Sequence, residues 1–274
     1  MNKIEVHLIA YSECKITKKR LATFTIKIPK FIWGHIKSHR ALSSNSASSR
    51  AIPARKIRQK VLYSPFIPVY FGFDKPGMQS GDALKGWRLF LAKKIWLWAR
   101  LFPVFFHYLG EKLGVHKEVI NRIIEPWLVV DIIVSGTEWK NFMTLREHEA
   151  AQPEMQIVAA EIKSLLQSTK PSLISEGEWH LPFILDKEKK LGVETKKKIS
   201  AARCARISYA LFNGETSSVD NDIKLYEKLT SSGHWSPLEH QAQAMSELKS
   251  SGNFIGWKQF RKEFEKENNG DYKN

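Results

Sequence analysis

Cysteine is scarce in this sequence of 274 residues, which contains only Cys14 and Cys204. The two thiols lie far apart in the chain, and neither belongs to a CxxC pair or has a histidine nearby at metal-ligand spacing. We therefore expect no disulfide framework and no metal site. Two lone thiols suit a reducing compartment, so the composition favours a cytoplasmic protein.

Long uncharged apolar runs are missing as well. The N-terminal stretch MNKIEVHLIAYSECKITKKR has neither the apolar core nor the small-residue cleavage site of a signal peptide. The most apolar stretch, residues 89–110, is interrupted by Lys93, Lys94 and Arg100, and each of these charges is costly inside a bilayer. We therefore expect a buried or subunit-facing helix here, with a membrane anchor as the less favoured alternative.

Acidic residues are outnumbered by basic ones, 28 to 43, which gives a formal net charge of +15. A surplus of this size attracts polyanions, whether nucleic acid, nucleotides or an anionic membrane, although a basic solvated surface would have the same composition. Nine Trp and fifteen Phe are more than a core of this size needs, so some aromatic faces are expected at a ligand or a subunit interface.

Hydrophobic periodicity predicts a mixture of strands and helices. Residues 4–10 and 21–28 alternate as strands do, and Pro29 opens a short helical segment. Helical patterns follow over 82–109 and 116–124, while 127–139 (WLVVDIIVSGTEW) fits a buried strand or a helix, with its length favouring the helix. We expect an α+β fold.

Composition shifts divide the chain into four parts. A main α+β region contains a serine- and arginine-rich stretch and the central helices, and the charged, glycine-containing segment DKEKKLGVETKKK is the best linker candidate. A compact unit and a solvated tail follow. The predicted boundaries are 1–185 for the main region, 186–198 for the linker, 199–262 for the compact unit and 263–274 for the tail.

Three separate stretches carry residues suited to anionic ligands. Residues 38–50 read SHRALSSNSASSR, in which guanidinium groups and hydroxyls are suited to grip phosphate, although a flexible serine linker has a similar composition. SAARCARISY places Arg203 and Arg206 three residues apart. GHWSPLEH, residues 233–240, surrounds a proline turn and also fits a capped helix start.

Together these stretches resemble the flavin-dependent thymidylate synthases, whose signature is Arg-His-Arg-x-x-Ser-x-Asn-Glu-x-Ser-x-Arg. AARCARISY resembles the family's Ala-Ala-Arg-Val-Ser-Tyr segment, and GHWSPLEH its Gly-His-x-(Ser/Thr)-Pro-x-Glu-His segment. NFMTLREHEAAQPEMQ resembles its flavin-contacting helix, especially at Leu145, Arg146, Gln152 and Glu154. The proline segment lies near the C-terminus instead of preceding the serine stretch, so the chain is similar to a circularly permuted, phage-type variant.

This resemblance implies a fold with a small antiparallel sheet and surrounding helices in permuted order. It further implies a homotetramer with shared active sites that converts dUMP to dTMP using FAD, NADPH and methylenetetrahydrofolate, in the host cytoplasm if the gene belongs to a phage. The implied catalytic residues are Ser48, Arg50 and Gln156. The implied cofactor-binding residues are His39, Arg40, Asn45, Arg146, His234, Ser236 and Glu239, and the implied substrate-binding residues are His35, Ser46, Ser48, Ser49, Arg50, Arg203 and Arg206.

The sequence departs from the family pattern at several places. Ser38, Ser46 and Ala51 stand where the family has Arg, Glu and often Tyr, and Ala150 stands where it has Asn or His near the flavin. Gln156 falls at the position of the Arg that polarises the uracil ring. Losing a cation there removes a means of stabilising developing negative charge, which Arg203 or Arg206 would have to replace.

Two other functions therefore stay open. A flavin- and folate-dependent enzyme lacking the usual cation could release a hydroxymethylated pyrimidine nucleotide instead of dTMP. A basic nucleic-acid-binding protein without catalysis would explain the charge and the aromatic residues, but not the spacing within the serine stretch. We expect a small-molecule nucleotide substrate, no membrane partner and no stable nucleic-acid partner.

Overall fold

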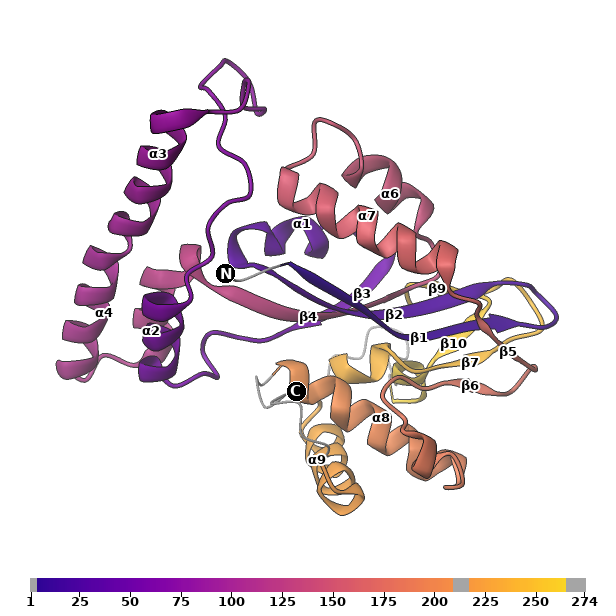
Figure 1. Cartoon of the computed structure of the whole chain (residues 1–274). Coiled ribbons are helices and arrows are strands. Elements are labelled where there is room, and N and C mark those ends of the chain that lie inside the picture. Colours follow the sequence, from indigo (N-terminus) through magenta and orange to yellow (C-terminus); the bar gives the residue numbers. More distant parts are fainter. Residues whose placement is uncertain (1–3, 209–216, 265–274) are drawn as a thin grey trace, which may run out of the picture.

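A five-stranded sheet forms the centre of the computed structural model, which describes residues 4–208 and 217–264. Helices cover both faces of this sheet, and a group of helices extends from one end (Figure 1). Its strand order is β3-β4-β2-β1-β5. The strands are β1 Glu5–Cys14, β2 Arg20–Pro29, β3 Leu42–Ser46, β4 Val129–Gly136 and β5 Ser172–Ile174.

The two strands predicted near the N-terminus are confirmed as β1 and β2. They pair antiparallel from Glu5 opposite Lys27 to Glu13 opposite Arg20, and β5 joins the other edge of β1 in parallel. The sheet is therefore antiparallel except at this last pair, and with the helices around it the expected α+β fold class is confirmed.

Residues 127–139 contain a strand, so the preference for a helix there was wrong. Strand β4 runs between β2 and β3 and pairs antiparallel with both. Its apolar run is rich in Val and Ile, which suit a pleated surface. Since β4 is covered on both faces, its residues do not alternate between apolar and polar, and the pattern alone does not separate it from a helix.

Three helices cover one face of the sheet and enclose the main core. Phe24, Ile26 and Ile132 from the strands pack against Ile36 and Val158 from the helices. The helices are α1 Trp33–Lys37, which the 3-10 turn η1 Lys30–Ile32 precedes, α6 Lys140–Arg146 and α7 Pro153–Ser168. The helical segment predicted after Pro29 is thus confirmed.

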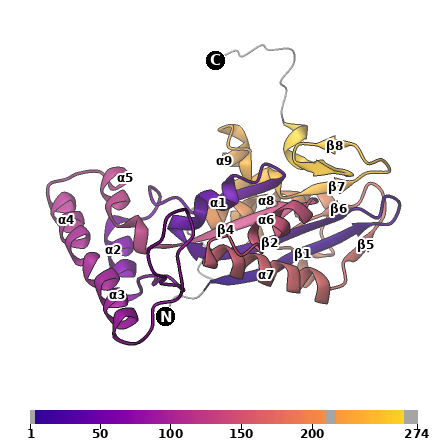
Figure 2. The ribbon, with the colours of Figure 1, turned by 90° about the horizontal axis from the view of Figure 1, so that it is seen from above.

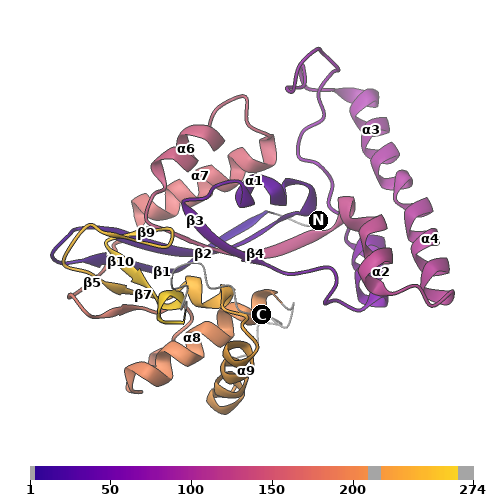
Figure 3. The ribbon, with the colours of Figure 1, turned by 180° about the vertical axis from the view of Figure 1, so that it is seen from behind.

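The C-terminal part of the chain covers the opposite face (Figures 1 and 3). Ile133 of β4 packs on Cys204, whose thiol is fully buried, and burial raises its pKa. The helical elements of this layer are η3 Asp186–Glu188, α8 Val193–Ser208, α9 Val219–Ser231, η4 Ser236–Glu239 and η5 Phe260–Glu263. Its strands are β6 Trp179–His180, β7 Ala242–Ala244, β8 Ser250–Ser251, β9 Phe254–Ile255 and β10 Trp257–Gln259.

Residues 54–127 form a helical lobe inserted between β3 and β4 (Figure 2). Helices α3 and α4 match the pattern predicted over 82–109, and none of the described helices is long and apolar enough to cross a membrane. The lobe contains α2 Ala54–Tyr63, α3 Gly86–Ala99, α4 Leu101–Lys112, α5 Lys117–Ile120 and the 3-10 segment η2 Asn121–Trp127.

Residues 186–198 are folded rather than a solvated linker. They form η3 and the first turns of α8, and they bury Glu188 and Lys197. Glu188 accepts two hydrogen bonds from Arg203, both of 2.7 Å, and Lys197 lies 4.4 Å from the ring centres of Trp179 and Phe260. Charge runs usually indicate solvent exposure, but here buried partners compensate two of the charges.

Arg203 organises a buried ion network in this layer. Its guanidinium donates to Glu188, to Asp222 over 2.9 Å and to the carbonyl of Phe183, and Asp222 also accepts from Arg206. Both carboxylate side chains are at most 4% exposed. Removing Arg203 would leave two buried negative charges without their main partner.

We predict that Arg203→Ala lowers the free energy of unfolding by about 3–5 kcal/mol, as expected for breaking a buried ion pair. Urea unfolding followed by circular dichroism measures the change. Lys189→Ala removes a cation whose partner, Asp186, is exposed, and it should leave the midpoint unchanged. Equal effects of the two substitutions would show that burial of the network contributes nothing.

Candidate functional site

The serine stretch is built around strand β3 at the edge of the sheet, so the flexible-linker alternative is wrong. β3 pairs with β4 on one side only. Because successive residues of a strand point to opposite faces, the stretch contacts both the C-terminal layer and the layer that contains α1. Ser43 and Asn45 contact the C-terminal layer, while Ser46 accepts a 2.7 Å hydrogen bond from the indole of Trp33 in α1.

The serine stretch and the proline turn meet directly. Asn45 Nδ2 donates to Ser236 Oγ over 3.0 Å, although the two residues are 191 positions apart in the chain. Beside them, Gln259 Nε2 donates to Ser43 Oγ over 2.9 Å and to the carbonyl of Glu239 over 3.1 Å. Two stretches singled out in the sequence therefore form one polar surface within a single chain.

Arg146 at the end of α6 contacts the start of the serine stretch and the end of α1 in the other layer. Its Nε donates to His39 Nε2 over 2.9 Å, and its Nη2 donates to the carbonyl of His35 and to Ser38 Oγ. Burial lowers the pKa of both histidines, and the neighbouring Arg146 charge lowers it further. Both rings are therefore neutral at pH 7, and the Nδ1 atom of His35 is buried without a hydrogen-bond partner among the described residues.

Ser49 and Arg50 follow β3 and contact the helical lobe through carboxylates. Ser49 Oγ donates to Glu125 over 2.6 Å, and Arg50 Nη1 donates to Glu118 over 3.0 Å. The Arg50–Glu118 pair is exposed, with both side chains more than half accessible. An exposed pair contributes little to stability, so a ligand anion is able to replace the Glu118 carboxylate.

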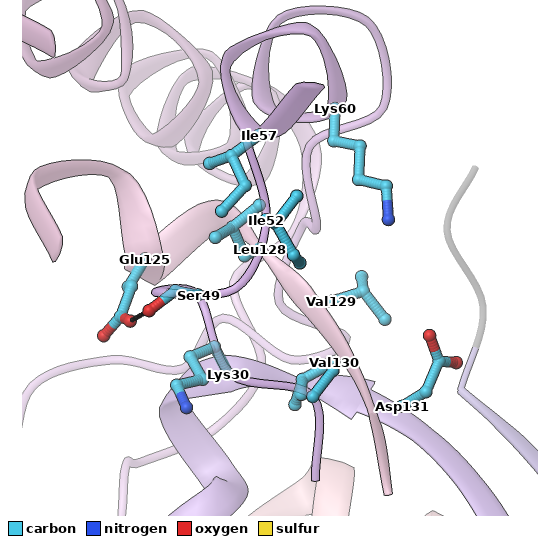
Figure 4. A pocket seen from close by; sticks show the side chains of 11 residues that line it. Lys30, Ser49, Ile52, Ile57, Lys60, Glu125, Leu128, Val129, Val130 and Asp131 are labelled. Atoms are coloured by element: carbon cyan, nitrogen blue, oxygen red, sulfur yellow. Dashed lines mark hydrogen bonds between the residues drawn. The ribbon is translucent and has the colours of Figure 1, made fainter. Parts of the chain in front are cut away.

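A small cavity of about 30 Å³ lies under this loop, between β4 and the lobe (Figure 4). Lys30 and Asp131 line it, and burial lowers the pKa of Lys30 and raises the pKa of Asp131. Figure 4 shows Ser49 bonded to Glu125 at one side of the cavity and Lys60 near Asp131 at the other. Its volume suits about one water molecule, so it is no nucleotide pocket.

Gln156 does not extend toward this surface from its place in α7. Its Nε2 donates to the carbonyls of His148, Glu149 and Ala151, which closes the loop between α6 and α7. The amide nitrogen is therefore engaged in holding a loop that follows Arg146. The structure gives Gln156 a positioning contact and does not support a direct catalytic one.

Arg203 and Arg206, predicted to bind substrate, are engaged in the ion network of α8 and α9 described above. Their guanidinium groups pair with Asp222, so the structure does not support the predicted role. Their three-residue spacing on a helix reflects a shared buried carboxylate instead.

The remaining predicted residues lie at the rim. Arg40 is exposed, with no ion pair or hydrogen bond of its side chain within the described ranges. The exposed His234 accepts or donates a 3.0 Å hydrogen bond at Ser232, and Glu239 pairs with Arg261 rather than capping a helix. Ser48 is half-buried and its carbonyl accepts the backbone N–H of Ala51.

Sequence reasoning missed two groups at this surface. Lys37 donates to the carbonyl of Ser44 on the open edge of β3, and Trp33 lies on the same short helix, one turn earlier. Gln259 and Arg261 come from a segment near the C-terminus that carried no recognisable signature. The i, i+4 spacing of Trp33 and Lys37 was the only available signal, and it is common on helices.

A buried polar network lies beneath the proline turn and connects the five-stranded sheet to the C-terminal layer. Hydrogen bonds of 2.6–2.9 Å run from Ser12 through His180, Thr23 and Ser135 to His240. Burial lowers the pKa of His180 to about 3, and burial together with the Lys37 and His180 charges lowers the pKa of His240 to about 3. Both rings are neutral and act as fixed hydrogen-bonding groups.

The donor set of this surface suits a phosphate-containing ligand rather than a metal. In the described part of the chain, no group of three or more His, Cys, Asp or Glu side chains is arranged to hold a metal ion. Arg146, Arg40, Lys37 and Arg50 instead provide cations along the 35–50 segment, and Arg is suited to phosphate through paired charge-assisted hydrogen bonds.

Comparisons with known proteins give similarity to solved structures only. No protein-family model and no curated protein matches the sequence. Two similar structures are of a UMP/dUMP methylase, PolB from Streptomyces cacaoi, bound with 5-Br UMP and with 5-Br dUMP. The first is 13% identical, with a TM-score of 0.47, and covers 61% of this chain and 89% of that chain. The second is 14% identical, with a TM-score of 0.45, and covers 61% and 90%.

We predict that stability falls as the pH is lowered from 6.5, because the unfolded chain then binds protons that His180 and His240 do not bind when folded. Each histidine contributes at most about 1.4 kcal/mol per pH unit down to its folded pKa. In His180→Gln the slope of unfolding free energy between pH 6 and pH 4.5 should decrease by about that amount. Urea titrations across this range measure it, and an unchanged slope would contradict the assignment.

Proposed function

We propose that this chain is a flavin-dependent thymidylate synthase, which methylates dUMP using methylenetetrahydrofolate and NADPH through FAD. The observation that carries the proposal is the hydrogen bond between Asn45 and Ser236. It joins two stretches that resemble separate signature segments of that family and that nothing in the chain order brings together. Arg146, from a third such stretch, donates a hydrogen bond to His39 at the start of the serine stretch.

The residues around α1 fit the phosphate and ring atoms of FAD. Arg146 and Arg40 supply cations for the pyrophosphate. His35 Nδ1 is a buried polar atom that has no hydrogen-bond partner among the described residues. Asn45, Ser236 and the neutral His39 offer hydrogen bonds without bringing a second charge. The flavin would supply the redox chemistry, since it accepts hydride from NADPH, and no cysteine nucleophile is then required.

The loop after β3 fits the phosphate of dUMP. Ser48 and Arg50 supply a hydroxyl and a guanidinium just beyond the end of a fixed strand, while the buried Ser49 between them holds the loop through its hydrogen bond to Glu125. Glu118 now pairs with Arg50, and a phosphate with more negative charge and more acceptor oxygens would displace it. Binding thus exchanges a weak exposed ion pair for a charge-assisted contact with substrate.

Stabilisation of the uracil ring falls to a cation other than those first proposed. Gln156 is engaged in its loop, and Arg203 and Arg206 pair with buried carboxylates. Lys37 lies beside the open edge of β3, so we assign it to the negative charge that develops on the ring. The resemblance further implies a homotetramer with shared sites and a permuted chain order, and we include both in the proposal.

We predict that the purified protein is yellow, or becomes yellow when FAD is added, and releases tritium from dUMP labelled at uracil C5 only when folate, NADPH and FAD are all present. Absorbance in the flavin bands and counting of released tritium measure the two properties. A protein that shows no flavin absorbance after incubation with FAD and removal of the free FAD would exclude the proposal. Mass spectrometry of the nucleotide distinguishes dTMP from a hydroxymethylated product.

We predict that Arg50→Ala raises the KM for dUMP by roughly 10–100-fold, because a charge-assisted hydrogen bond to phosphate contributes about 1.5–3 kcal/mol. Initial rates at saturating folate and NADPH measure the change. Arg55→Ala removes an equally exposed cation from the nearby α2 and is the matched control, with the KM expected to stay at the wild-type value. Similar increases in both variants would indicate only long-range attraction.

A further inference from the structure

Helices α3 and α4 form an arm that extends away from the sheet (Figures 1 and 2). The single residue between them, Arg100, is itself helical, so the two helices follow one another along the arm. The arm faces the rest of the lobe through Val104 and His107, its two buried side chains, and α3 buries none.

The opposite side of the arm carries a regular apolar stripe. Its members follow each other at intervals of four and three residues, the heptad spacing of a helix that packs against another helix. Each side chain is between 38% and 73% exposed. The stripe consists of Leu91, Ile95, Trp98, Phe102, Phe105 and Leu109.

We propose that this stripe is the interface through which the chain associates with a second copy of itself, with the two arms packed against each other. The area is adequate. With roughly 200 Å² for each large apolar side chain, weighted by its exposed fraction, the six stripe residues offer roughly 600 Å², and the flanking Trp87 and Phe106 raise this to roughly 900 Å². A standard interface buries about 800 Å² on each partner.

A second arm explains the pattern better than a lipid surface does. A membrane interface favours one apolar face opposite a charged, solvated one, whereas here the opposite face packs on protein. Intervals of three and four residues suit a lipid-facing helix as well, so the packed opposite face is the feature that separates the two. Self-pairing about a two-fold axis places the same stripe on both sides, so a single sequence supplies both halves of the contact.

Buried hydrogen bonds connect the arm to the loop after β3, which carries Ser49 and Arg50. His107 Nε2 lies 2.9 Å from Asn121 Oδ1, and Asn121 Nδ2 donates to the carbonyls of Ser49 and Ile52 over 2.8 and 3.0 Å. Pairing of the arms would therefore hold the backbone beside Arg50 in place. This consequence rests on the proposed function, whereas the pairing itself does not.

The test is the mass of the protein in solution, measured by light scattering after size exclusion. The wild-type chain should have at least twice the 31.6 kDa of one copy, and Trp98→Glu with Phe102→Glu should have no more than half of the wild-type mass. Ile16→Glu with Leu248→Glu, which changes two similarly exposed apolar residues outside the arm, is the control and should retain the wild-type mass. Circular dichroism and the unfolding midpoint verify that both variants are folded.

Three outcomes would overturn the proposal. The wild-type chain could have the mass of one copy, the arm variant could keep the wild-type mass, or the control could dissociate as the arm variant does. A wild-type monomer that sediments with phosphatidylglycerol vesicles, but not with phosphatidylcholine vesicles, would assign the stripe to an anionic membrane instead. Mass is independent of turnover, so loss of flavin binding or of tritium release leaves this test intact.

Discussion

The alternation of side chains along one edge strand determines how the candidate site is built. Strand β3 is fixed on one edge by β4, and its pleat sends Asn45 to the C-terminal layer and Ser46 to the α1 layer. A shift of one residue in this pairing would reverse both contacts. The register of a short strand therefore determines which residues of the serine stretch meet the proline turn and which meet α1.

The basic surplus is distributed unequally between structure and ligand binding. In the C-terminal layer, Arg203 and Lys197 are buried and matched by carboxylates, so their charges stabilise the fold. Along the 35–50 segment, Arg40 has no acidic partner in the described ranges, and Arg50 has one that is exposed. The charges of Arg40 and Arg50 therefore remain available to anions. The net charge of +15 counts them together with the buried, paired cations, so it did not identify them.

The sequence predicted the local elements better than the long-range contacts. Period-two alternation of apolar and polar residues identified β1 and β2, most clearly over residues 24–28, where buried and partly exposed positions also alternate. It failed for β4, which is buried on both faces, and charge density failed for 186–198, where Glu188 is paired inside the protein. In both cases the residues that decide burial belong to other elements of the fold, which the local sequence pattern does not contain.

For the candidate site as well, the sequence selected some residues and missed contacts that depend on the fold. Resemblance to a known signature selected Asn45, Ser236 and Arg146, and the structure pairs Asn45 with Ser236 and Arg146 with His39 of the serine stretch. It also selected Arg203, because a motif reports residue type and spacing but not which carboxylate lies nearby. Lys37 was overlooked because a lysine on a five-residue helix has no distinctive pattern until the carbonyl it binds is placed beside it.

The protonation states separate the role of the histidines from that of the arginines. His35, His39, His180 and His240 all have a lowered pKa, so near pH 7 they contribute hydrogen bonds and no charge. The proposed anion binding would then depend on guanidinium groups, which remain protonated in proteins. A nucleotide phosphate loses part of its charge below about pH 6, so weaker binding in acid would originate in the ligand. Loss of stability in the same range would originate in the buried histidines, which separates the two effects.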